Sequence, residues 1–215
     1  MNINTSFKKI RQFLGNIVAQ IYRGNENNID GRDSNHFERL LLRCCKKNNL
    51  EGVKYILNSN ENINVNTEDR LGLTPLIIAC KVNNTNMAKL LLDKGAIVNV
   101  KSKSGEMPIL IACQKNNKLL VQYLLDKNKR VINSQDNYGR TPVLIALDND
   151  KIDMIKCLLK YEPNLDIKDN IGRTPLMIAS QNKNTYLTGL FLNGEDVFPI
   201  YDVKNFTKIK DKTVV

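Results

Sequence analysis

Residue types that commonly perform chemistry are few in this chain, and their spacing does not suit that chemistry. The one histidine, His36, has no second histidine with which to hold a metal ion and no readable Ser or Cys partner for a catalytic triad. Cys44 and Cys45 are adjacent, whereas zinc and redox pairs place two residues between their cysteines. The glycine-rich patterns that bind phosphates do not occur. These residues therefore indicate no nucleophile, metal centre or nucleotide site.

Three clustered aspartates, Asp148, Asp150 and Asp153, are the remaining candidates for acid–base chemistry, because two close carboxylates can share that work. In the repeat register described below they fall around the end of one helix, where a solvated acidic patch is expected. We therefore predict that the protein is not an enzyme and has no catalytic, cofactor-binding or metal residues. Its function then has to be carried by its surface.

An eight-residue stretch recurs along the chain, and the elements that shape the surface are organised around it. The copies begin at Gly72, Gly105, Gly139 and Gly172, so the spacings are 33, 34 and 33 residues. A fixed period in this range is typical of stacked supersecondary units. The sequence therefore predicts a repeat array.

Each copy carries the signals of a helix start. Thr74, Thr141 and Thr174 are placed to cap a helix, and the proline after each suits the first helical position. The copy that begins at Gly105 has Met107 in the capping position, so we expect Met107→Thr to stabilise the fold by about 1 kcal/mol. We expect these first helices to end near residues that tolerate left-handed geometry, namely Asn83, Asn116 and Asp150.

The Gly-x-Thr-Pro-Leu starts at Gly72 and Gly172, with variants at Gly105 and Gly139, resemble the ankyrin repeat family. The endings of the second helices add to this resemblance, at Leu90–Leu92, Tyr123–Leu125 and Cys157–Leu159, and so does the segment Lys94–Asn99 after the first of them. The resemblance covers about residues 36–197. The resemblance implies an all-α ankyrin repeat solenoid of about five helix-turn-helix repeats with short hairpin tips. We expect the repeat domain to cover 35–197, divided into 35–71 (N-terminal cap), 72–104, 105–138, 139–171 and 172–197 (C-terminal cap).

One departure from the family concerns the residue after Thr-Pro-Leu, which is often histidine in ankyrin repeats. This chain has apolar residues there, Ile77, Leu110, Leu144 and Met177. The hydrogen bonds of that histidine are therefore absent, and stability has to depend more on apolar packing.

The segments outside the repeats are basic. Residues 1–34 read as an amphipathic helix over about 6–23 and a linker, and residues 198–215 as a basic tail. The sequence leaves several readings of this segment open: a helix that docks on the first repeat or on a partner, a helix that lies on a membrane surface, a targeting segment, or disorder. No stretch is long and apolar enough to span a membrane, and no secretory signal is evident.

The cysteines indicate the redox state of the compartment in which the protein resides. Three of the five, Cys45, Cys80 and Cys113, share one repeat position, where we expect small core side chains. An odd number of free thiols fits a reducing compartment, so we expect an intracellular protein, cytoplasmic first, with the nucleus or a host cell as alternatives. We expect a monomer.

The resemblance also implies where a partner binds, because ankyrin proteins usually use the concave face made by the hairpin tips and first helices. Across these positions eight basic residues stand against three acids, Glu68, Glu106 and Asp148, within a chain of net charge +10. We therefore expect a protein partner with an acidic surface and a role as an adaptor or host-directed effector. The alternatives are a membrane-associated adaptor and charge-driven nucleic-acid binding. The candidate partner-binding residues are Arg70, Leu71, Lys81, Lys101, Lys103, Lys115, Gln135, Asn137, Tyr138, Arg140, Lys168, Asn170 and Arg173.

Overall fold

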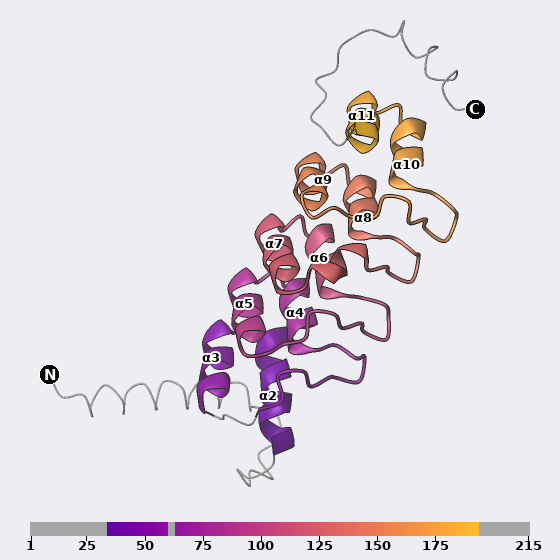
Figure 1. Cartoon of the computed structure of the whole chain (residues 1–215). Helices are drawn as coiled ribbons and strands as arrows, with labels where there is room; N and C mark the ends of the chain where they lie inside the picture. The colour runs from indigo at the N-terminus through magenta and orange to yellow at the C-terminus, as the bar shows by residue number, and fades with distance from the viewer. Residues whose placement is uncertain (1–33, 60–62, 194–215) are drawn as a thin grey trace, which may run out of the picture.

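The computed structural model describes residues 34–59 and 63–193, and within them it confirms the all-α repeat solenoid. Pairs of helices stack side by side into an elongated array, and a hairpin tip projects between successive pairs (Figure 1). The expected N-terminal helix at 6–23 and the tail at 198–215 lie outside the described residues. The pairs are α2 (Ser34–Lys46) with α3 (Leu50–Ser59), α4 (Pro75–Lys81) with α5 (Thr85–Asp93), α6 (Pro108–Gln114) with α7 (Lys118–Lys127), α8 (Pro142–Asp148) with α9 (Ile152–Leu159), and α10 (Pro175–Gln181) with α11 (Thr185–Asn193).

Two parallel rows of helices share one continuous core. The inner row, α2, α4, α6, α8 and α10, lies next to the tips, and the outer row, α3, α5, α7, α9 and α11, lies behind it (Figure 1). Each helix contacts its partner, and neighbours within a row contact each other along the whole inner row and from α3 to α9 in the outer row. Apolar side chains are therefore buried between repeats as well as within them. Leu91, Leu124 and Leu158 of the outer row are fully buried, as the repeat register requires.

The inner helices begin where the capping pattern predicts. The hydroxyls of Thr74, Thr141 and Thr174 each accept a hydrogen bond from the backbone amide three residues on, and a proline occupies the next position. Met107 makes no such bond, but its side chain is only 6% exposed and belongs to the core. We therefore revise the expectation and predict that Met107→Thr destabilises the fold, because about 1 kcal/mol from a cap does not offset the loss of a buried methionine.

Asparagines build the turn between the helices of a repeat. Asn83 and Asn116 take positive φ angles of 56° and 53°, so they end the inner helices as expected. Asn84 and Asn117 follow them and cap the outer helices by accepting bonds from backbone amides. The side-chain amide of Asn117 also donates to Asn83 of the preceding repeat over 2.7 Å. The fourth repeat has Lys151 in this position, and it makes no side-chain cap.

The extra residue in the third repeat has a structural explanation. After α7 the chain forms a short 3-10 helix, Lys129–Asn133, which is absent from the corresponding place after α5. It turns Val131 and Ile132 into the core, where the second repeat instead uses Ala96 and Val98. The insertion is thus absorbed in a loop behind the tips and leaves the helix stacking unchanged.

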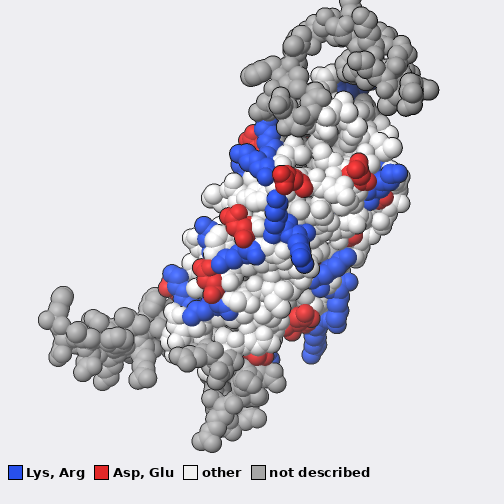
Figure 2. All heavy atoms as spheres, in the orientation of Figure 1, with Lys and Arg blue, Asp and Glu red and all other residues white. Residues whose placement is uncertain are grey.

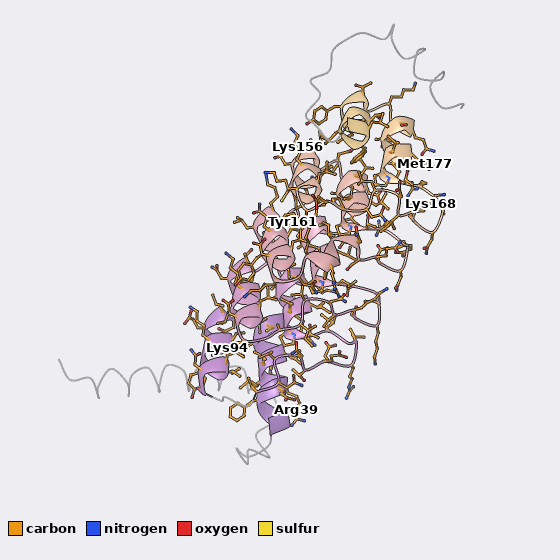
Figure 3. The ribbon with its side chains drawn as sticks, in the orientation of Figure 1. Arg39, Lys94, Lys156, Tyr161, Lys168 and Met177 are labelled. Atoms are coloured by element: carbon orange, nitrogen blue, oxygen red, sulfur yellow. The ribbon has the colours of Figure 1, made fainter. Side chains whose placement is uncertain are left out.

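The inner row ends at α10, and this changes the burial of equivalent residues. Ile77, Leu110 and Leu144 are buried under the next inner helix, whereas Met177 is 48% exposed because the described residues contain no inner helix after α10. Met177 lies on α10, on the side of the molecule from which the tips project (Figure 3). Position in the array therefore converts a core residue into a surface one.

Candidate functional site

Each hairpin tip is built around one short polar side chain, three residues before the glycine. Asp69, Asp136 and Asp169 use one carboxylate oxygen to accept two backbone amides across the turn, at 2.8–3.1 Å for Asp136 and Asp169. Ser102 accepts one amide in the same way in the second tip. Sequence reasoning missed these four residues, although they recur with the same spacing as the glycines.

The two arginines of the candidate site are held by these aspartates. Arg140 pairs with Asp136 at 2.9 Å and with Asp148 at 3.3 Å, and Arg173 pairs with Asp169 at 2.8 Å. Burial by itself would raise the pKa of Asp169, but bonds from the Arg173 and Ile171 amides and the Arg173 side chain outweigh it and hold the pKa below its usual value. Both guanidinium groups are therefore fixed in place and electrostatically compensated.

Backbone and side-chain hydrogen bonds join neighbouring tips into one ladder. The Lys103 amide donates to the Leu71 carbonyl at 3.1 Å, and the Asn170 amide donates to the Tyr138 carbonyl at 2.9 Å. Side chains of the candidate set add further bonds to backbone carbonyls of neighbouring tips. The side-chain amide of Asn137 donates to the Ser104 carbonyl, and the side-chain amide of Asn170 donates to the Asn137 carbonyl. The side-chain amide of Gln135 donates to the Lys168 carbonyl, and the Lys103 ammonium donates to the Arg70 carbonyl. The tips thus form one hydrogen-bonded surface.

Exposed apolar side chains stand in one row on that surface. The residue before the tip glycine is Leu71, Tyr138 or Ile171, and their exposed fractions are 64%, 69% and 74%. The second tip has Ser104 in this position. An apolar side chain repeated at one register and left in solvent is the pattern expected of contact residues.

The positive charge of the face is concentrated on its first half. Lys and Arg side chains lie along the edge formed by the tips (Figure 2). Arg70, Lys101, Lys103 and Lys115 have no carboxylate partner among the described residues, whereas Lys81 pairs with Glu106 at 2.6 Å. The count of eight basic residues against three acids omitted Asp69, Asp136 and Asp169, so the balance on this face is eight against six.

Comparison with known proteins agrees with this geometry. A family model for ankyrin repeats (3 copies) matches residues 41–136 and 109–198. The chain belongs to the ankyrin repeat family. The chain is 39% identical over 59 residues to the putative ankyrin repeat protein FPV031 of Fowlpox virus (strain NVSL), and the matched region is 27% of this chain and 17% of that protein. It is 34% identical over 85 residues to M-phase phosphoprotein 8 of Mus musculus and of Rattus norvegicus, covering 37% of this chain and 10% of theirs.

Ankyrin repeats are generally non-catalytic protein–protein interaction modules. In the part of this ankyrin chain that the structure describes, no three His, Cys, Asp or Glu side chains gather where a metal ion would be held. Nor does any helix in that part have the length and apolar character needed to cross a membrane. Burial raises the pKa of Cys44 to about 11 and those of Cys45 and Cys80 to about 12, which disfavours the thiolate form of these side chains at neutral pH.

Proposed function

We propose that this protein is an interaction module that binds a partner protein through its hairpin tips and inner helices, with the partner's acidic residues over the first two tips. One observation carries the proposal. The tips hold a row of exposed apolar side chains, Leu71, Tyr138 and Ile171, on a surface already fixed by tip-to-tip hydrogen bonds. A surface that is ordered before binding loses little conformational entropy when a partner arrives.

The basic residues of the first two tips then steer and orient the partner. Arg70 and Lys101 are exposed, and neither side chain forms an ion pair within the described residues. Charges at the rim of an interface mainly raise the association rate and its dependence on salt, and each exposed pair contributes about 0.2–1 kcal/mol. An adaptor or host-directed role fits this arrangement and would follow from the identity of the partner.

Photo-crosslinking followed by affinity measurement tests this proposal. A photoreactive residue placed at Leu71 should crosslink a protein in cells, whereas one placed at Tyr55 on α3 of the outer row should not. The crosslinked protein is then identified and purified. Arg70→Glu with Lys101→Glu should weaken its binding to the full-length chain about tenfold and flatten the salt dependence.

The matched control is Lys94→Glu with Arg130→Glu, which changes the net charge equally. Lys94 lies on the outer-helix side, away from the tips (Figure 3), and Arg130 lies in the loop after α7. Equal losses in the two charge variants would refute binding at the tips. Mixed-sequence DNA or RNA that binds with a steep salt slope, and loses affinity only in the tip variant, would favour nucleic acid as the ligand instead.

A further inference from the structure

The two halves of the tip face differ in chemistry, and the clearest difference is a hollow in the second half. It lies between the third and fourth tips and has a volume of about 450 Å³. Tyr138 and Ile171 contribute its apolar lining, and Arg140 and Arg173 line it with the carboxylates that hold them. This volume is within the range of small ligand pockets, so it suits one or two inserted side chains and is too small for a folded element.

Both cations of this hollow are already paired with carboxylates. Arg140 shares its guanidinium between Asp148, which lines the hollow, and Asp136, which does not, and Arg173 is bound to Asp169. Two cations therefore meet three carboxylates, and the group carries a net negative charge. A partner carboxylate entering here would meet Asp148 and would gain no uncompensated cation. The hollow is therefore not a site for the acidic residues of a partner.

An apolar side chain meets better complementarity in the same place. The Arg140 guanidinium lies over the Tyr138 ring at 5.1 Å from its centroid, which fixes both groups. Ile171 adds an aliphatic surface that is largely open to solvent. A bulky apolar side chain between them would exclude water from exposed apolar atoms and leave the ion pairs intact, as anchors of binding interfaces do.

The first half of the face has the opposite character. Arg70, Lys101 and Lys103 direct their charges to solvent or to backbone carbonyls, and none forms an ion pair among the described residues. Their excess charge attracts carboxylates from a partner. Successive packed helices lie about 8–10 Å apart, so the centre of the first two tips is about 16–20 Å from the hollow. An extended chain covers this distance with about five or six residues.

We propose that the tip face recognises an extended partner segment in which a cluster of acidic residues lies about five residues from one bulky apolar side chain. The acidic cluster binds over the first two tips, and the apolar side chain enters the hollow between Tyr138 and Ile171. This inference rests on the proposed function and adds to it the chemical class and the order of the bound segment.

Peptide selection tests the inference directly. Random peptides about sixteen residues long, enough to cover the four tips in extended form, are displayed on phage and selected against the full-length chain. The enriched sequences should combine an acidic cluster and a bulky apolar residue about five positions apart. A synthetic peptide of that sequence should bind at least tenfold more weakly to the variant Tyr138→Ala with Ile171→Ala, with an unchanged salt dependence.

Control variants separate the possible outcomes. Ile97→Ala with Leu119→Ala removes two other exposed apolar side chains, which are 54% and 67% exposed. Ile97 lies in the loop after α5 and Leu119 on α7, and neither lines the hollow, so this variant should leave binding unchanged. If Tyr138→Ala disturbs folding, Ile171→Ala alone serves, because its side chain is the more exposed of the two.

Several results would overturn the inference. Enriched peptides without an apolar residue, no enrichment at all, or binding that is insensitive to both hollow variants would each do so. If the Arg70→Glu and Lys101→Glu variant still weakens binding in that last case, the proposed function stands without the inference. If neither the charge variant nor the hollow variants weaken binding, of the peptides or of the crosslinked protein, both the inference and the proposed function fail.

Discussion

A single change at Lys151 is expected to stabilise the fourth repeat, because it restores a cap that the array uses elsewhere. Asn84 and Asn117 begin the outer helices of their repeats with φ and ψ of −96° and 93°, and −91° and 83°. Lys151 has almost the same backbone geometry, −93° and 72°, but its side chain makes no cap. Asparagine therefore fits at this position without backbone rearrangement.

The size of the effect follows from the bonds gained. An asparagine cap is worth about 1 kcal/mol, and a bond from the new side-chain amide to the Asn116 side chain, like the 2.7 Å bond between Asn117 and Asn83, would add about 0.5 kcal/mol. Part of this gain is already present, because the Met154 amide donates to the Lys151 carbonyl at 2.9 Å. We therefore expect Lys151→Asn to raise the free energy of unfolding by about 1 kcal/mol and Tm by about 2–4 °C.

Urea unfolding of the full-length chain, with equal m-values required for both proteins, measures this change. Lys151→Gln is the matched control, because it removes the same positive charge from the helix N-terminus but is too long to cap. Charge removal alone is worth about 0.3–1 kcal/mol at such a position. If the glutamine variant gains as much as the asparagine variant, the capping explanation is refuted.

Three further predictions concern the core and the tips. Met107→Thr should lower the free energy of unfolding by about 1–2 kcal/mol in urea titrations, and a gain would show that the cap outweighs burial. Gly139→Ala should lower the free energy of unfolding by at least about 1 kcal/mol more than Gly172→Ala. Both glycines have positive φ, but only at Gly139 would the new Cβ lie 2.8 Å from the Asn170 backbone nitrogen. Equal losses of stability in the two variants would exclude this contact between the tips. Asp169→Asn should be about 1–2 kcal/mol less stable at pH 7. Because the pKa of Asp169 is lowered in the folded protein, its contribution is present above about pH 4 and is lost as the pH falls further, so the variant should lose less stability on acidification.

The sequence by itself determined the repeat, its period and the helix starts. These features depend on short-range chemistry: a threonine cap, a proline in the first helical position and an asparagine in left-handed geometry act within a few residues. A 33-residue spacing of such signals then leaves one arrangement in which every apolar stripe is buried. The same period also places an aspartate three residues before three of the four tip glycines, and this recurrence was a readable signal that charge counting overlooked.

Tertiary structure alone decided which residues of the candidate face are available to a partner. Arg140 and Lys101 look alike in a charge count, yet the first is held by two carboxylates and the second contacts only a carbonyl of the next tip. Burial differs in the same way, because Leu144 and Met177 share a register but only Leu144 has a following inner helix among the described residues. The physical reason is that pairing and burial depend on neighbours about 33 residues away, whose distances are set by how the repeats stack and not by the local sequence.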